Sequence, residues 1–359
     1  MILCGSGNTI ILALNGREWP LPQQSFVSLR FQRAVNLSVP IVELVINDEQ
    51  DWLRTNNIVD GTLLTVMLAI DFNAYQYDFV ITDIVKDQGK ENKTTIVGLL
   101  AKPKWFRGVC QPFYGTSYEA IKHIAEECDY TFTSNISVTD DAKLWTGNLT
   151  NYGMAMEIAS RGYVNEKSCM VLACGLEGIA YNNIFEEINW DKAKNFVQQP
   201  KSNSDIVAVK TALVKSGAGS QMIYTYPIML VSQGLKENNI IEQTTFSKDF
   251  SEVLPVGVYV KDKLDFTRRE IYPLDIGNNH KNEPQAYYQN LKRKAMFLDT
   301  VVVYCNHFKT VSLLEPVKVD YNGQATRGIV SSIITTFDSA NQQISTRVDV
   351  STTNANMKE

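Results

Sequence analysis

The stretch WTGNLTNYGMAMEIASRGYV, residues 145–164, has the pattern of a short helix inside a chain that otherwise predicts mostly strands. Thr150 or Asn151 can cap this helix, because a short polar side chain accepts hydrogen bonds from the first backbone N–H groups. Gly162 is typical of the position after the last turn. The apolar residues at helical spacing are Met154, Ala155, Ile158 and Ala159. Since the stretch holds no nucleophile motif, metal pair or phosphate loop, we expect a packing helix rather than a catalytic one.

A second helix is expected over residues 117–127, within GTSYEAIKHIAEECDYTF. Thr116 and Glu119 have the spacing of a capping box, in which each side chain accepts a hydrogen bond from the backbone of the other. The apolar face of this helix consists of Ile121, Ile124, Ala125 and Cys128. The runs CMVLAC (169–174) and GIAYNNI (178–184) predict a hairpin. Residues 113–187 are therefore predicted to form a compact α+β module of two helices and a small sheet.

Residues 1–112 alternate apolar and polar side chains as antiparallel strands do. In one such run, Val27, Leu29 and Phe31 fall on one side of the strand and polar side chains on the other. Asn15–Gly16 and Asp60–Gly61 are turn dipeptides. The six expected strands are NTIILALNG (8–16), FVSLRFQRAV (26–35), PIVELVIND (40–48), LLTVMLAID (63–71), YQYDFVITDIV (75–85) and KTTIVGLLA (93–101). This segment is predicted to form a tube-like β-barrel.

The C-terminal segment, residues 284–359, is expected to enter a second, smaller barrel through a helix. Pro284 lies near the start of that helix, where its missing N–H costs nothing. Four strands are expected after it: DTVVVYC (299–305), KTVSLLEPVKVDYN (309–322), GIVSSIITTFD (328–338) and QQISTRVDVS (342–351). Residues 188–283 predict an irregular, β-containing connecting region. The predicted fold class is mainly β with an α+β insert: two tube-like antiparallel β-barrel domains flanking a small α+β module.

Composition limits the classes of function. The formal net charge is -5 and the lysines and arginines are scattered apart from LKRK (291–294), which argues against a protein that grips nucleic acid. No apolar run is long enough to cross a membrane, and MILCGSGNTI lacks the basic start of a signal peptide. The six cysteines form no CxxC pair. We therefore expect buried, reduced cysteines, no stable membrane insertion, and synthesis in the cytoplasm.

The sequence contains no constellation typical of an active site. Its three histidines, His123, His280 and His307, are far apart, and a Cys305–His307 pair would supply only two metal ligands. The loop SGAGS (216–220) lacks the Gly-Lys-Ser/Thr end of a phosphate loop. The adjacent acids are expected on the solvated surface; they are Glu126–Glu127, Asp140–Asp141 and Glu186–Glu187. We expect no catalytic, cofactor-binding or metal site, no cofactor, and no enzyme activity.

The order of these segments resembles the central hub proteins of contractile phage tails, the late control D-type proteins, and the hub half of type VI secretion spike proteins. Residues 26–48 and 59–87 look like the first tube-like barrel of that family. Residues 115–132 and 145–164 look like its paired helices, and residues 287–321 and 328–351 like the helix, strands and closing hairpin of its second barrel. Glu315–Pro316 departs from the family, which often has Pro-Gly there.

The resemblance implies a structural baseplate hub protein. Three copies would form a ring of six similar barrels and adapt a sixfold tail tube to a threefold central spike. The implied partners are two further copies of the chain, the tail tube protein, the central spike protein and the baseplate wedge proteins, with DNA only passing through the lumen. The implied location is the baseplate of the virion, after synthesis in the host cytoplasm.

Two other classes stay open from the sequence. A distal tail or tail-tip protein of a non-contractile phage could share the barrels. A β-rich carbohydrate-binding or hydrolytic protein is the other alternative, although a hydrolase should show convergent acids or a triad. A sugar-binding protein should expose aromatic side chains on loops, and the five tryptophans are dispersed along the chain.

Overall fold

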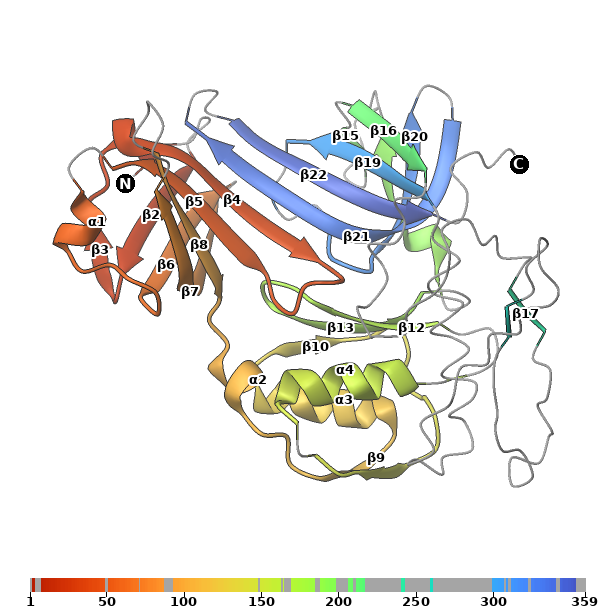
Figure 1. Ribbon diagram of the computed structural model, residues 1–359. Helices are drawn as coiled ribbons and strands as arrows, with labels where there is room; N and C mark the ends of the chain where they lie inside the picture. The colour runs from red at the N-terminus through yellow and green to blue at the C-terminus, as the bar shows by residue number, and fades with distance from the viewer. Residues whose placement is uncertain are drawn as a thin grey trace.

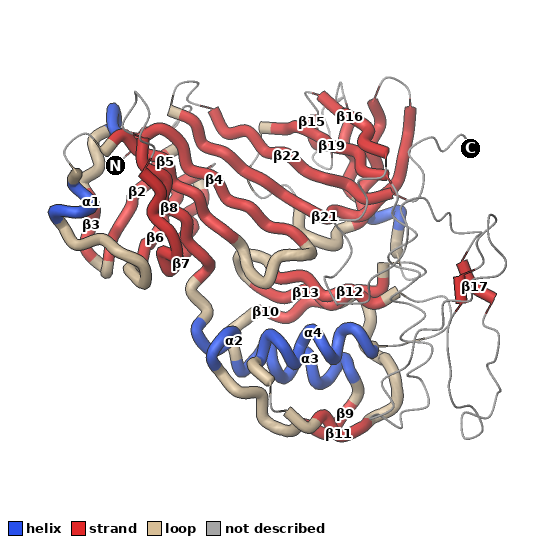
Figure 2. The backbone as a smooth tube through the Cα atoms, in the orientation of Figure 1, coloured by secondary structure: helices blue, strands red, loops and turns tan. Residues whose placement is uncertain are grey.

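The computed structural model describes residues 2–3, 8–48, 51–70, 72–86, 93–147, 149–162, 164, 169–184, 188–197, 206–208, 211–216, 240–242, 259–260, 299–306, 308, 311–321, 324–339 and 343–352. Strands make up most of these residues, and the predicted mainly β fold with an α+β insert is confirmed (Figure 1). Figure 2 shows α2, α3 and α4 gathered in one part of the molecule. Within the described ranges, no helix combines the length and the apolar character needed to cross a membrane.

All six strands predicted in the N-terminal segment are present. They are β2 (Thr9–Leu14), β4 (Phe26–Ala34), β5 (Ile41–Asn47), β6 (Leu63–Ile70), β7 (Asn73–Lys86) and β8 (Lys93–Leu100). They pair antiparallel in the order β2-β6-β7-β8-β5-β4. Alternation places one face of each strand inside: in β5, Val42, Leu44 and Ile46 are buried and their neighbours are partly exposed. The inward side chains form the core of the first barrel.

Short elements complete this barrel. Strands β1 (Ile2–Leu3) and β3 (Arg17–Trp19) both pair with β2, and the 3-10 turn η1 (Gln23–Ser25) leads directly into β4. The Gln23 side chain accepts from the Leu3 backbone N–H at 2.8 Å and donates to the Leu3 carbonyl at 3.2 Å. The amide side chain of Gln23 thereby takes the place of a strand partner along β1, which is an end strand of the sheet.

The second sheet contains the four strands predicted near the C-terminus, β19 (Asp299–Cys305), β20 (Pro316–Tyr321), β21 (Gln324–Asp338) and β22 (Gln343–Thr352). Three strands from the connecting region join it: β14 (Lys194–Val197), β15 (Ile206–Ala208) and β16 (Thr211–Ser216). The order is β15-β14-β20-β21-β22-β19-β16. The pairs of β14 with β15 and β20 are parallel, whereas the others in this sheet are antiparallel.

The two end strands of this order lie close together. Only two residues separate the end of β15 from the start of β16 in the sequence. Three Cα–Cα steps span at most about 11 Å, so these ends of the sheet must approach one another. The second sheet is therefore curled back on itself, as predicted for a small barrel.

One strand pairing joins the two barrels. Strand β4 lies antiparallel to β21, from Ser28 opposite Asp338 to Ala34 opposite Ser332. Both barrels therefore belong to a single continuous sheet (Figure 1). The prediction named both strands but not their pairing.

The α+β module lies between the barrels in sequence. The short helix α2 (Pro103–Arg107) precedes it, and its elements are β9 (Phe113–Gly115), α3 (Ser117–Glu127), β10 (Thr131–Thr133), β11 (Lys143–Trp145), α4 (Asn151–Arg161), β12 (Met170–Cys174) and β13 (Gly178–Asn183). The hairpin predicted from residues 169–174 and 178–184 is present as β12 and β13, and β10 pairs parallel to β13. Helices α3 and α4 pack on one face of the β10-β13-β12 sheet, and its other face is turned toward the barrels (Figure 1).

Both helix starts follow the predicted caps. Thr116 and Glu119 form the capping box of α3, and the Thr150 side chain accepts from the Gly153 N–H of α4. Gly162 directly follows the last turn of α4, as expected, but it has extended geometry (φ -63°, ψ 135°) rather than the left-handed conformation that often favours glycine there. A Cβ at this position would lie 1.6 Å from the Tyr181 hydroxyl. Close packing against Tyr181 therefore accounts for this glycine.

Other predictions lie outside the described residues or stay predictions. The helix expected near Pro284 falls outside the described ranges. Two short strands of the connecting region, β17 (Ile240–Glu242) and β18 (Tyr259–Val260), pair with each other. The division of the chain after residues 112, 187 and 283 remains a prediction.

Candidate functional site

The residues weighed as metal ligands do not come together where the structure describes them. His123 is partly exposed on α3, where it stacks on Phe113 at 4.8 Å and lies 3.5 Å from Glu127. Cys305 is buried in β19, and His280 and His307 lie outside the described residues. No group of three or more His, Cys, Asp or Glu in the described ranges could hold a metal ion.

The adjacent acids divide into different environments. Glu126 lies 3.9 Å from Lys122 and belongs to the charged surface of α3, as expected. The expectation was wrong for Asp140, which is only 5% exposed. Its Oδ1 accepts from the Ser117 backbone N–H at 2.8 Å and thereby caps the start of α3. Glu186–Glu187 lie outside the described residues.

The cysteines are packing residues wherever they are described. Cys110, Cys128, Cys169, Cys174 and Cys305 are buried, and they form no disulfide with one another. Burial raises the pKa of Cys110 and Cys128 to about 11 and that of Cys174 to about 12. These three thiols are protonated at neutral pH, which makes them poor nucleophiles.

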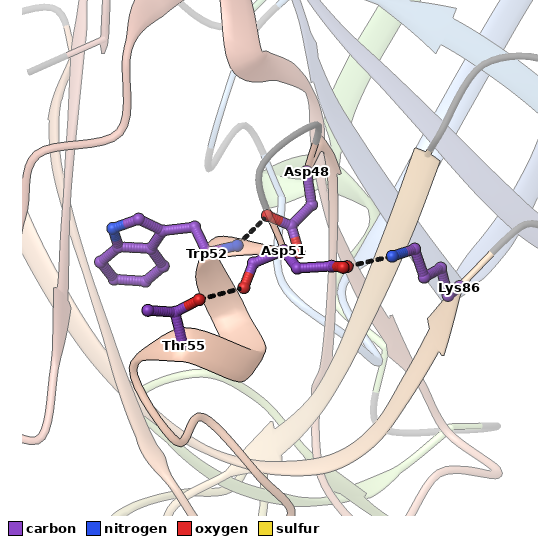
Figure 3. A network of polar contacts seen from close by, with 5 residues as sticks. All are labelled: Asp48, Asp51, Trp52, Thr55 and Lys86. Carbon is purple, nitrogen blue, oxygen red and sulfur yellow. Dashed lines mark hydrogen bonds and ion pairs between the residues drawn. The ribbon is translucent and has the colours of Figure 1, made fainter.

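A set of paired polar side chains lies beside α1 (Trp52–Thr55) in the first barrel and is shown in Figure 3. Asp48 accepts from the Trp52 backbone N–H at 2.7 Å, and Thr55 Oγ1 donates to the Asp51 carbonyl at 3.0 Å. Lys86, at the end of β7, pairs with the Asp51 carboxylate and lowers its pKa. The geometry supports a rigid corner, because these acids hold a helix start and a lysine.

The α+β module carries several exposed apolar side chains. Tyr114 of β9 and Leu144 of β11 face each other across the two-stranded ribbon and are 71% and 61% exposed. Val109 and Leu149 are also exposed on adjoining backbone, since Cys110 N–H bonds to the Leu149 carbonyl. We call these four residues the ribbon patch. The β9–β11 ribbon, which carries Tyr114 and Leu144, lies beyond the helices and away from the barrels (Figure 1). Exposed apolar side chains at such a place are typical of a protein-binding surface.

The first barrel carries a second exposed apolar feature at the tip of the β6–β7 hairpin. Phe72 is fully exposed and has a left-handed φ of 64°. This conformation is unfavourable for an aromatic residue and costs about 1–2 kcal/mol. Exposure and backbone strain together make the hairpin tip a candidate contact point.

Arg33 is the residue that sequence reasoning missed. It is 6% exposed on the inner face of β4 and lines a cavity of about 260 Å³ beneath the barrels. The alternation that places Leu29 and Phe31 inside also places Arg33 inside, two positions further on. That alternation was the available indication.

Comparisons with known proteins identify the fold. No family model and no curated protein matches the chain. The 43 kDa tail protein of prophage MuSo2 from Shewanella oneidensis is similar in structure, with a TM-score of 0.60 and 13% identity over 98% of this chain and 99% of that protein. The tail protein from Neisseria meningitidis MC58 is similar with a TM-score of 0.52 and 9% identity, covering 96% of each chain. The chain therefore shares the fold of these two tail proteins over almost its whole length.

Proposed function

We propose that this chain is a structural subunit of a phage tail baseplate. The observation that carries the proposal is the likeness to two tail proteins across 96–98% of the chain, which includes both barrels and the module. A partial match could reflect one common barrel, whereas this likeness spans the complete order of elements. Fold alone does not specify function, so the surfaces must supply the rest of the argument.

The finer proposal is a homotrimeric hub of a contractile tail. Each chain carries two barrels joined through β4 and β21, so three chains would present six barrels around one axis. Such a ring would match a sixfold tail tube on one side and a threefold central spike on the other. The net charge of -5 suits a lumen through which DNA passes without being gripped.

The exposed apolar features suggest how partners would bind. The β9–β11 ribbon with Tyr114 and Leu144 is separated from the barrels by α3 and α4, so the ribbon patch would meet the spike while the barrels meet the tube and one another. Phe72 projects from the first barrel and would contact a neighbouring subunit or a wedge protein. Burying such side chains would contribute about 1.5–3 kcal/mol each.

Mass photometry of the purified chain, alone and mixed with its spike protein, tests this proposal. A trimer at three times the 40.4 kDa chain mass is expected in at least one of the two samples. An obligate dimer would contradict the hub, because it cannot generate a threefold axis. Immunogold labelling of virions with an antibody to the chain should mark the baseplate; labelling elsewhere would contradict the location.

We propose no catalytic function. Incubation with peptidoglycan should release no soluble fragments above the buffer control. Turnover that a single acid substitution abolishes would overturn this part of the proposal and favour the hydrolytic alternative.

A further inference from the structure

Arg33 occupies an unusual position for a cation. It lies near the end of β4, which runs toward the β12–β13 hairpin of the module (Figure 1). Its Nη2 donates to Thr335 Oγ1 at 3.5 Å, and its guanidinium lies 6.0 Å from the centre of the Phe308 ring. Its Nε is buried and has no hydrogen-bond partner among the residues that the structure describes. Among the described carboxylates, none forms an ion pair with Arg33.

A buried charge without a counterion is unfavourable, because its lost hydration is not compensated. Burial accordingly lowers the pKa of Arg33 to about 10, still well above neutral pH. Its neighbour Tyr77 does not supply a negative charge, because burial raises the pKa of that phenol to about 12. The guanidinium therefore stays charged at neutral pH, and the described part of the chain gives it only weak partners.

The cavity in front of Arg33 has room for a ligand group. Its volume of about 260 Å³ corresponds to several water molecules. Thr131 and Thr133 of β10 line it on the module side, and Ser312 lines it on the barrel side. Hydroxyl groups can donate hydrogen bonds, and Arg33 has a planar fork of donors. Arg33 and these hydroxyls thus line one partly open cavity, and a guanidinium on its wall suits a planar anion.

We propose that the Arg33 cavity binds a carboxylate group. The fork geometry of a guanidinium matches the two oxygens of a carboxylate, and a desolvated pair of this kind is stronger than a neutral hydrogen bond. An acidic side chain or a terminal carboxylate of a docking polypeptide could provide the group, as could a small free acid. The site would act at the junction of the two barrels and the module, where an occupant would tie three parts of the chain together. The proposal does not require that the chain be a tail subunit.

Glu177 is the carboxylate that must be tested as a competitor. It is exposed on the cavity rim, and Tyr77 lies 3.4 Å from its Oε1. If Glu177 moved to pair with Arg33, the cavity would hold an internal ion pair and no external anion would be needed. Glu177→Gln distinguishes these arrangements, since it removes the internal acid and keeps the size of the side chain.

The test is thermal unfolding of the purified chain with acetate, with a short peptide ending in Asp-Glu, and with inorganic phosphate, at constant ionic strength set by chloride. The variants are Arg33→Met, Arg33→Lys and Glu177→Gln, with Arg30→Met as the matched control. Arg30 lies on the same strand but pairs with Glu43 at 3.6 Å and is 38% exposed. We expect acetate or the acidic peptide to raise Tm of the wild type, Arg30→Met and Glu177→Gln in a saturable way.

The Arg33 variants supply the decisive outcomes. Arg33→Met should lose the carboxylate-dependent shift, and Arg33→Lys should weaken the apparent affinity at least about tenfold because it lacks the fork. The peptide separates a docking polypeptide from a free acid: tighter binding of the peptide than of acetate assigns the former. Three outcomes would each overturn the proposal. The first is an equal shift of Tm in the wild type and in Arg33→Met, and the second is a response to phosphate but not to carboxylates. The third is a Glu177→Gln chain that unfolds at a lower temperature and gains no stability from acetate. If Arg33→Met does not fold, Arg33→Lys gives the same comparison.

Discussion

Replacing Gly162 tests whether packing or backbone conformation requires glycine at the end of α4. A Cβ added there would lie 1.6 Å from Tyr181 Oη, 3.0 Å from Tyr181 Cζ and 3.2 Å from Ser117 Oγ. Tyr181 is completely buried on β13 and approaches Ser117 Oγ at 3.5 Å, so its ring cannot move without disturbing the start of α3. Overpacking of this kind costs about 1–3 kcal/mol, and losing the hydrogen bond adds about 1 kcal/mol. Gly162→Ala should therefore lower the free energy of unfolding by about 2–4 kcal/mol.

Two further variants separate the explanations. Asparagine tolerates left-handed geometry, so Gly162→Asn would be the mildest substitution if a left-handed cap were needed. Because φ is -63°, we expect Gly162→Asn to be at least as damaging as Gly162→Ala. Tyr181→Phe removes the hydroxyl that meets the new Cβ, so Gly162→Ala should cost less in that background.

The assay is urea unfolding followed by far-UV circular dichroism, with hydrogen exchange of α3 and α4 peptides to place the effect in the module. Gly153→Ala, in the first turn of the same helix, is the matched control. Its Cβ would meet nothing closer than 3.3 Å, so the change should stay within about 1 kcal/mol. The steric explanation would be refuted if Gly162→Ala lowered the free energy of unfolding no more than Gly153→Ala. It would also be refuted if Gly162→Asn left the free energy of unfolding almost unchanged.

Three further predictions address the other sites. Asp48→Ala should cost about 1 kcal/mol in urea unfolding because the Trp52 N–H loses its acceptor, while Asp48→Asn should cost clearly less; equal losses would contradict the capping role. The double substitution Tyr114→Ser and Leu144→Ser should leave Tm almost unchanged, because both side chains are exposed, yet weaken spike binding in a pull-down; unchanged binding would exclude the ribbon patch as that surface. Tyr77 has its pKa raised from 10.0 to about 12, so its contribution is fully present below pH 10 and is lost as pH rises toward 12. Tyr77→Phe should flatten this alkaline loss in a pH series of Tm values, and an identical alkaline profile in the variant would contradict the assignment.

Local patterns predicted the local elements. The capping box at Thr116 and the alternation in residues 41–47 each depend on neighbours within a few residues, and both elements begin and end close to the expected positions. The alternation in β4 also indicates that Arg33 faces inward with Leu29 and Phe31. Because an arginine in a strand is ordinarily exposed, its burial is not expected from the sequence. Asp140 was misplaced for a related reason: its hydrogen-bond partner lies 23 residues away in the sequence.

Local patterns do not predict which distant strands pair with each other. The contact between β4 and β21 joins residues about 300 positions apart, and periodicity states which face of a strand is apolar but not which edge it pairs with. The connecting region is a similar case, because β14 is too short for a clear period and pairs parallel to β20. Its membership in the second barrel depends on partners from the C-terminal segment.

The β4–β21 pairing has a mechanical consequence for the proposed hub. Seven residue pairs in one ladder fix the offset and twist between the two barrels, so a chain cannot vary the spacing of its own barrels without breaking backbone hydrogen bonds. Contacts between chains have no such covalent continuity and depend on surface side chains. In a ring of three chains, the rigid joints within chains would therefore alternate with joints that can adjust. The six barrels of the ring would then form three equivalent pairs, one pair in each chain. An adaptor between a sixfold tube and a threefold spike requires this change of symmetry.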